Sequence, residues 1–333
     1  MQTPRSQSMT TFNFGLLGVG RWGERYISTI NELAGIQIRQ LYTSKPDKAR
    51  LVGNPVEVFA DWRDVIHSSG CDAVIVSTPP HTHGEILREC LAANKPALVE
   101  KPLCLSADEA LALHEEAERR GTPVLVGHTQ LFNPAYGALR DRAGARRDIR
   151  FIVSQGAGFG PFRKDTPPLW DWCPHDVAFC LDLLGDIPAN IEALGASATP
   201  DRKSRQEMLA LRLDFSGGTV AWILAGCLST ERTRSLSVFF SDSVLCLRED
   251  ETGSSLVSYD VPVDERDQLP ATFRLSAGKS VAVSPEKPLT REVQYFVQGL
   301  RGGDTRRFGT QLAVDVVRTL EQAQKALIKR VAS

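Results

Sequence analysis

A glycine turn near the start of the chain constrains the fold more than any other feature. Phe12–Leu17 is an apolar run typical of a strand, and a helix is predicted from about Trp22 to Leu33. The turn between them reads Gly18-Val19-Gly20-Arg21-Trp22-Gly23. In this setting Gly18 permits a tight turn, Gly20 lets the backbone approach a pyrophosphate, and Gly23 lets the helix pack on the strand.

The free N–H groups at the start of that helix favour an anion. We therefore expect the turn to bind a dinucleotide, with contacts from Gly18, Gly20, Arg21, Trp22 and Gly23. The alternative is a glycine-rich turn that binds no ligand.

The first 130 residues alternate short apolar runs with helical patterns. After the first strand, further strands are predicted at Ile36–Tyr42, Val56–Phe59, Ala73–Ser77, Ala97–Val99 and Val124–Val126. Further helices are predicted at about Thr82–Ala93 and Ser106–Arg120. Strand–helix alternation with short connections predicts a doubly wound α/β domain on a parallel sheet.

The pattern changes after about Phe132, where longer strands follow one another without helices between them. These strands are predicted at Arg150–Ala157, Ile191–Ala198, Glu207–Phe215, Thr219–Ala225, Leu236–Phe240 and Val244–Arg248. Helices are predicted at Asn133–Arg142, at about 290–300 and at 310–329. We expect an α+β domain with a large, open, mainly antiparallel sheet.

The length of 333 residues favours two domains. We predict a loose leader (1–10), a Rossmann domain (11–130) and a substrate-binding and oligomerisation domain (131–333).

The formal net charge of -1 argues against nucleic-acid partners, and no apolar run is long enough to span a membrane. Seven cysteines without a C-x-x-C pair predict reduced thiols in a cytoplasmic protein. No set of well-spaced metal ligands is present, so we expect no metal site.

The residues after the second strand bear on cofactor choice. An NAD site places Asp or Glu there to bind the ribose 2′-hydroxyl, but this chain has Thr43, Ser44 and Lys45. Two hydroxyls and a lysine suit a 2′-phosphate, so we predict that NADP(H) is preferred and that NAD(H) is possible. The alternative is that Lys45 is a solvated loop lysine and specificity is relaxed.

Two segments follow strands of the predicted parallel sheet, at the edge where such sheets bind ligands. Ser77-Thr78-Pro79-Pro80 ends the fourth strand, and Glu100-Lys101-Pro102 ends the fifth. We expect both segments to lie where a nicotinamide and a substrate meet. The position before a proline favours an extended backbone for Lys101, which could then exchange a proton with a substrate oxygen. It could also be a surface lysine.

The second domain carries an acid and a histidine close together, in the run Leu169-Trp170-Asp171-Trp172-Cys173-Pro174-His175-Asp176. A proline suits the first turn of a helix, so we predict a helix from Pro174 to Leu184. Asp171 would precede that helix, and His175 would lie in its first turn, where the positive helix end favours a neutral imidazole. The alternative is a structural histidine.

Taken together, these segments resemble the glucose–fructose oxidoreductase, inositol dehydrogenase and rhizopine-catabolism (Gfo/Idh/MocA) family. The matching motifs are Gly18–Gly23, Thr78-Pro79-Pro80 with His83, Glu100-Lys101-Pro102, and Asp171 four residues before His175. The chain departs from the commonest family pattern at Ala178, where an Asp is usual, and carries Asp176 directly after His175 instead.

The resemblance implies an NAD(P)-dependent oxidoreductase acting on the secondary hydroxyl of a sugar-like substrate, with Lys101 and His175 flanking the carbinol. Asp171 would orient substrate hydroxyls, and Glu100 would lie near the nicotinamide. The residues expected to contact the cofactor beyond the glycine turn are Thr43, Ser44, Lys45, Ser77, Thr78, Pro79, His83, Glu100 and Lys101. Those expected to contact the substrate are His128, Asn133, Arg163 and Trp172.

The resemblance further implies that the open sheet packs against that of another subunit in a homodimer or homotetramer. Two other functions stay open. One is a non-catalytic NAD(P)-binding regulator of the same fold, and the other is an imine or C=C reductase. Prompt reduction of the cofactor by a sugar would exclude the regulator.

Overall fold

The computed structural model describes residues 11–144, 146, 148–163, 166–198, 206–261 and 276–331. The predicted leader, residues 1–10, lies outside this range. Contacts divide the chain into two units. Within these described residues, the first unit comprises those between 11 and 104, 111 and 127, and 293 and 310. The second comprises those between 105 and 110, 128 and 292, and 311 and 331. None of the described helices is long and apolar enough to cross a membrane.

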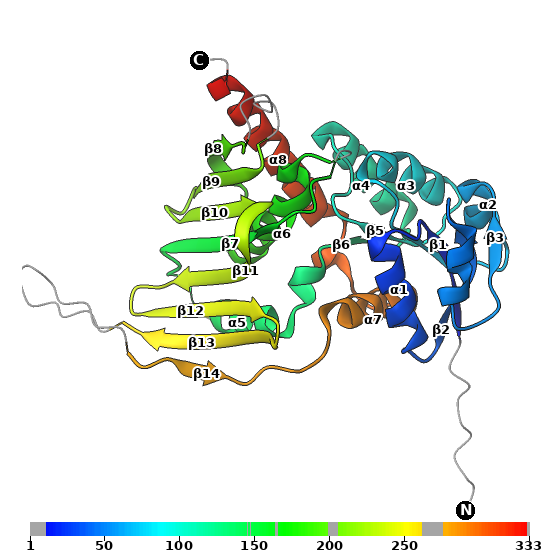
Figure 1. Ribbon diagram of the computed structural model, residues 1–333, viewed down its shortest axis with the longest axis horizontal. Helices are drawn as coiled ribbons and strands as arrows, with labels where there is room; N and C mark the ends of the chain where they lie inside the picture. Colours follow the sequence, from blue (N-terminus) through cyan, green and yellow to red (C-terminus); the bar gives the residue numbers. More distant parts are fainter. Residues whose placement is uncertain are drawn as a thin grey trace, which may run out of the picture. The chain divides into compact units, whose positions relative to one another are not determined.

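The first unit holds a sheet of six parallel strands in the order β3-β2-β1-β4-β5-β6 (Figure 1). The strands are β1 (Phe12–Leu17), β2 (Ile36–Tyr42), β3 (Glu57–Phe59), β4 (Ala73–Val76), β5 (Ala97–Glu100) and β6 (Val124–Gly127). Strands β4, β5 and β6 are buried at every position, because helices cover both faces of a doubly wound sheet. The predicted doubly wound parallel sheet is confirmed.

The helices of the first unit follow strands of this sheet in the chain, except the last, which comes near the end of the sequence. They are α1 (Arg21–Asn31), α2 (Trp62–His67), α3 (His83–Ala92), α4 (Ala107–Arg120) and α7 (Pro288–Leu300), with 3-10 turns η1 (Pro46–Leu51) and η2 (Pro80–Thr82). The sequence prediction missed α2, a helix of six residues, which is too short to show a hydrophobic period. Its one local signal is Asp61, whose side chain accepts a hydrogen bond from the backbone N–H of Arg63 at 2.9 Å.

The second unit holds a sheet of eight strands in the order β14-β13-β12-β11-β7-β10-β9-β8. The strands are β7 (Phe151–Phe159), β8 (Pro188–Ala196), β9 (Met208–Phe215), β10 (Val220–Gly226), β11 (Leu228–Phe239), β12 (Ser243–Asp250), β13 (Gly253–Asp260) and β14 (Lys279–Val281). Every neighbouring pair is antiparallel except β7 and β10. The predicted open, mainly antiparallel sheet is confirmed.

Within the described residues, the second unit also contains helices and a short 3-10 turn, and two of the helices contact its sheet. The helices are α5 (Pro134–Gly144), α6 (Pro168–Leu184) and α8 (Thr310–Val331), and the 3-10 turn is η3 (Thr129–Phe132). Helix α6 contacts β7, β9 and β10, and α5 contacts β12 and β13, as their places beside the sheet in Figure 1 show. Alternate side chains along neighbouring strands are buried, among them Ile152, Leu211, Ile223 and Leu236, each at most 1% exposed.

The start of α6 corrects the sequence prediction. The helix begins at Pro168, not at Pro174, which lies inside it. Pro168 occupies the first turn, where a missing N–H group costs nothing, and the second proline is tolerated within the helix. Asp171 therefore lies in the first turn and His175 about two turns in, which removes the helix-end argument for a neutral imidazole. The helix ends at Leu184, as predicted, and Gly185 follows it in a left-handed conformation with φ 62°.

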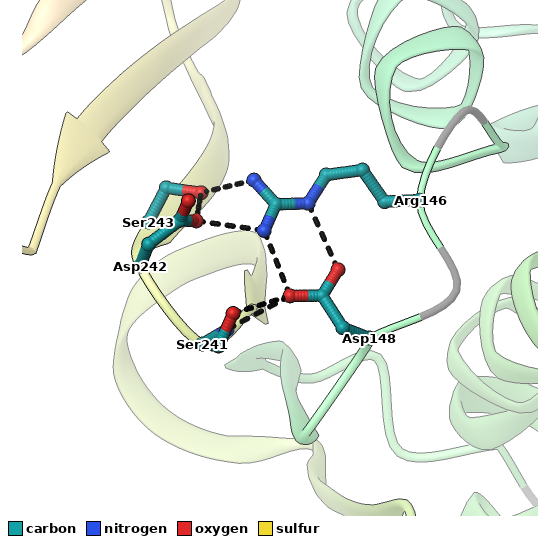
Figure 2. A network of polar contacts seen from close by, with 5 residues as sticks. All are labelled: Arg146, Asp148, Ser241, Asp242 and Ser243. Atoms are coloured by element: carbon teal, nitrogen blue, oxygen red, sulfur yellow. Dashed lines mark hydrogen bonds and ion pairs between the residues drawn. The ribbon is translucent and has the colours of Figure 1, made fainter.

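The start of β7 is tied to the turn between β11 and β12 by a polar network (Figure 2). The guanidinium of Arg146 donates two hydrogen bonds to Asp148, and also bonds Asp242 at 2.7 Å and Ser243 at 2.9 Å. Ser241 donates to the same carboxylate of Asp148 at 2.6 Å. These bonds hold the pKa of Asp148 well below its usual range. The network fixes one end of β7 relative to its neighbour β11.

Candidate active site

The glycine turn after β1 has the geometry that its sequence predicts. Gly18 adopts φ +92°, which side chains rarely tolerate, and a Cβ there would lie 2.9 Å from the carbonyl oxygen of Ser77. A Cβ on Gly23 would collide with the carbonyl oxygen of Gly18. A Cβ on Gly20, by contrast, would meet nothing within 4 Å. Gly18 and Gly23 thus serve the turn itself, whereas Gly20 keeps open space beside it.

Ser77 locks this turn onto the neighbouring strand. Its hydroxyl donates to the carbonyl oxygen of Gly18 at 2.7 Å, and its backbone N–H donates to that of Leu17 at 2.9 Å. The two segments meet because β1 and β4 are adjacent and parallel, so their carboxyl ends share one edge of the sheet. The strand order reverses at this pair, and open α/β sheets bind ligands at such a point.

The residues around this edge fit a dinucleotide. Helix α1 begins at Arg21, and its N-cap is Gly20, which has no side chain to satisfy the first N–H groups. Those groups and the helix dipole suit a pyrophosphate, which can approach closely because nothing fills the space beside Gly20. The predicted phosphate-binding residues of this turn therefore come together at one helix start.

The segment after β2 lies next to the glycine turn, because β2 pairs with β1. Ser44 and Lys45 are exposed, and the hydroxyl of Thr43 accepts a hydrogen bond from the backbone N–H of Lys45 at 3.1 Å. Nearby Lys48 pairs with Glu24 of α1. The segment thus carries two hydroxyls and an exposed lysine after β2, where Rossmann domains contact the ribose of a dinucleotide.

His83 lies beneath the loops that follow β4 and β5. It is 1% exposed, and its ring nitrogens are 2.8 Å from the carbonyl oxygen of Pro102 and 2.9 Å from that of Thr78. Burial lowers the pKa of His83, although both carbonyls favour the protonated ring. The structure therefore places His83 as a link between the two loops, under Thr78 and Pro79.

Glu100 and Lys101 end β5 as buried residues, 4% and 8% exposed. Tyr26 of α1 donates its hydroxyl to Glu100 at 3.0 Å, and the backbone N–H of Lys101 donates to the other carboxylate oxygen at 3.2 Å. Burial raises the pKa of Glu100 to about 7, and the neighbouring charge of Lys101 opposes this effect. Lys101 is therefore not a solvated surface lysine, the alternative that the sequence left open.

The candidate substrate residues of the second unit lie on and just before α6. Arg163 is 3.4 Å from the carboxylate of Asp171 in the first turn. Trp172 is partly exposed, and one edge of its ring lies against Gly158 of β7. His175 is 9% exposed. Asp171 and His175 are four residues apart and so lie on similar sides of the helix.

Two other predicted substrate residues are buried in the second unit. Asn133 is 1% exposed, accepts a hydrogen bond from the backbone N–H of Ala135 and donates one to Ser254 at 2.7 Å. It therefore caps α5 and connects it to β13. His128, 2% exposed, precedes η3. In the part of the chain that the structure describes, no group of His, Cys, Asp or Glu residues could hold a metal ion.

Four further residues had no predicted role. They are Tyr26, Ser154, Asp176 and Arg234, all of which make buried or partly buried polar contacts. Tyr26 and Ser154 lie within predicted elements and have no local signal. Asp176 was notable only for following His175, and its partners come from two strands that are distant in sequence.

Comparison with known proteins places this geometry among oxidoreductases. The family model GFO_IDH_MocA, described as an oxidoreductase family with an NAD-binding Rossmann fold, matches residues 12–128. The solved structure of a proposed oxidoreductase from Magnetospirillum magnetotacticum MS-1 is 34% identical. It has a TM-score of 0.82 over 94% of this chain and 99% of that one.

Curated relatives are similar over shorter stretches. UDP-N-acetylglucosamine 3-dehydrogenase of Acidithiobacillus ferrooxidans is 28% identical over 68% of this chain and 71% of its own length. Inositol 2-dehydrogenase 2 of Saccharopolyspora erythraea is 29% identical over 58% of each chain. The match therefore spans somewhat more than half of the inositol enzyme.

Proposed function

Because this chain belongs to the Gfo/Idh/MocA family of NAD-binding Rossmann-fold oxidoreductases, we propose that it transfers a hydride between a nicotinamide cofactor and a secondary hydroxyl or keto carbon of a sugar, sugar nucleotide or polyol. One observation carries the proposal. At the carboxyl edge of the parallel sheet, the glycine turn after β1 leaves open space beside Gly20, and the buried Lys101 follows β5 at the same edge. The names of the relatives, dehydrogenases of UDP-N-acetylglucosamine and inositol, support a hydroxylated substrate.

Three side chains manage the substrate in this proposal. Oxidation of a secondary hydroxyl requires its proton to leave when the hydride leaves carbon. Lys101 and His175 hold or move that proton at the reacting oxygen, and Asp171 orients neighbouring hydroxyls. When bound, the nicotinamide supplies the hydride acceptor or donor. Arg163, Trp172 and His128 remain candidate substrate contacts, whereas the cap made by Asn133 favours a structural role for it.

We further propose that NADP(H) is the preferred cofactor and that NAD(H) is accepted more weakly. The support is chemical, because no carboxylate follows β2 directly, and Ser44 and Lys45 are exposed next to the glycine turn. Titration of the purified protein with NADPH and NADH, followed by nucleotide fluorescence, tests this preference. Tighter binding of NADH would overturn it and leave the hydride-transfer proposal intact.

Self-association through the open sheet is also part of the proposal. The sheet face opposite α6 exposes three large apolar side chains on β8 and β10: Leu194, Trp222 and Leu224, which are 39–48% exposed. Leu194 and Leu224 both pair across Ala210 of β9, so they form one row. A homodimer or homotetramer would cover this row, since exposed apolar patches mark contact surfaces.

The proposed compartment is the cytoplasm. All seven cysteines are free and buried, and burial raises the pKa of Cys71. Such thiols suit a reducing environment.

The activity is tested with a panel of UDP-N-acetylglucosamine, myo-inositol and scyllo-inositol, each with NAD⁺ and NADP⁺. Lys101→Met should lower turnover at least about 100-fold and leave the dissociation constant of NADPH within about twofold. Lys279→Met, which changes an exposed lysine of the second unit, is the matched control. Unchanged turnover in Lys101→Met would refute its role in proton transfer.

A further inference from the structure

Asp176 follows His175 directly, and the proposed reaction gives it no part in the chemistry. Its side chain is fully buried on α6 and accepts a hydrogen bond from Ser154 of β7 at 2.6 Å. Arg234 of β11, 14% exposed, contacts both of its carboxylate oxygens through one nitrogen, at 3.2 and 3.3 Å. Burial raises the pKa of Asp176, and the guanidinium of Arg234 opposes that rise.

Two glycines of β7 make room for this contact. A Cβ on Gly156 would lie 2.7 Å from a carboxylate oxygen of Asp176 and 2.9 Å from the guanidinium of Arg234. A Cβ on Gly158 would lie 3.3 Å from the ring of Trp172. Neither glycine has a positive φ angle. The contact therefore requires the absence of a side chain at these positions, and not the backbone freedom of glycine.

The distance between the two contacting side chains on α6 matches the distance between the two glycines on β7. Trp172 and Asp176 are four residues apart, a rise of about 6 Å along a helix. Gly158 and Gly156 are two residues apart on one face of β7, about 6.6 Å along a strand. Side chains one turn apart on α6 therefore fit neighbouring recesses on one face of β7, which fixes both the height and the rotation of the helix.

From this arrangement we propose that Ser154, Asp176 and Arg234, with the recess at Gly156, form a positioning network that sets the orientation of His175. The proposal rests on the proposed function, in which His175 handles the substrate proton. Neighbouring residues point about 100° apart around a helix, so anchoring Asp176 under α6 determines where His175 points. The three anchors are positioning residues, since they act through the helix.

The position of the His175 side chain depends strongly on the rotation of α6. A helix rotation of about 10° moves a group lying about 5–6 Å from the axis by about 1 Å. A misplacement of that size can lower a rate about 100-fold. An apolar contact could hold the helix against the sheet but would allow it to rotate, whereas a charged pair with a third hydrogen bond accepts one orientation.

The test reads the environment of His175 by NMR, without any need for turnover. The chain has six histidines, so ¹³C labelling of histidine Cε1 gives a simple spectrum, and His175→Gln assigns its signal. Gly156→Ala, Asp176→Asn and Arg234→Met should shift or split that signal. Ser154→Ala, which keeps the ion pair, is the mildest variant and should shift it less.

Two variants serve as controls in the same unit. Arg234→Lys should keep the signal near its wild-type position, because one nitrogen makes both contacts to Asp176. Asp260→Asn removes a charge from the exposed pair with Lys279 and should leave the signal unchanged. With the panel substrate that the wild type oxidises, Gly156→Ala and Asp176→Asn should lower kcat about 10- to 100-fold, without change in NADPH affinity.

The outcomes separate the two proposals. A His175 signal that stays in place in both Gly156→Ala and Asp176→Asn overturns the positioning network, even if those proteins melt at lower temperature. Wild-type turnover in His175→Gln would instead overturn the role of His175 in the proposed function, and the NMR comparison would still decide whether the network orients it.

Discussion

Replacing Glu100 by Gln should change how the stability of the first unit depends on pH. The carboxyl is 4% exposed and accepts hydrogen bonds from Tyr26 and from the backbone of Lys101. Burial raises its pKa to about 7, against 4.5 for an ordinary glutamate. Folding therefore favours the protonated form, and the ionised form is costly.

The sign and size of the effect follow from linkage. Between pH 4.5 and about 7 the unfolded chain has lost the proton that the folded chain keeps, so stability falls as pH rises through this window. At 1.36 kcal/mol for each pH unit, the loss is roughly 3 kcal/mol and is complete above about pH 8. Gln removes this dependence, at a constant cost of about 1 kcal/mol for the lost acceptor of the Lys101 N–H group.

Differential scanning calorimetry at several values between pH 5 and pH 8.5 measures the difference. Glu100→Gln should melt below the wild type in acid and above it in base. At about 2–4 °C per kcal/mol, the difference in Tm between the two proteins should change by about 6–12 °C across the range. Glu115→Gln, an exposed change in the same unit, is the control. A difference in Tm that stays constant with pH would refute the reasoning.

Four further changes have specific expected results. Gly20→Ala should weaken NADPH binding more than about tenfold and leave Tm unchanged, because its methyl group meets no protein atom but obstructs the pyrophosphate; equal affinity by fluorescence titration would contradict this. Lys45→Ala should weaken NADPH but not NADH, whereas Arg50→Ala should affect neither; parallel losses for both nucleotides would reject a 2′-phosphate contact. Trp222→Glu should shift the mass measured by light scattering toward the monomer, and an unchanged mass would exclude this face as the contact. Asn133→Ala should lower stability by about 2 kcal/mol through the lost helix cap and hydrogen bond, with KM unchanged; a raised KM would restore it as a substrate contact.

Local patterns in the sequence determined the strands of the parallel sheet and the glycine turn. Phe12–Leu17 and Ile36–Tyr42 form strands at the predicted bounds, because apolar runs bounded by turn residues have few alternatives. The glycine turn could be predicted because the conformation of Gly18 and the close packing at Gly23 are local requirements. Lys101 was identifiable as a candidate because it directly follows a strand, and strand ends in parallel sheets share an edge.

Only the tertiary structure decided which residues support these groups. Tyr26 meets Glu100 across 74 residues, and Asp176 meets Arg234 across 58. No sequence pattern encodes such pairs, since each partner lies in an ordinary helix or strand. The start of α6 was predicted wrongly for a related reason, because Pro168 and Pro174 both suit a helix start and packing against β7 decides between them. Local chemistry thus determined where the chain turns and which candidate side chains follow its strands. Burial and long-range packing decided which other side chains hold those candidates in place.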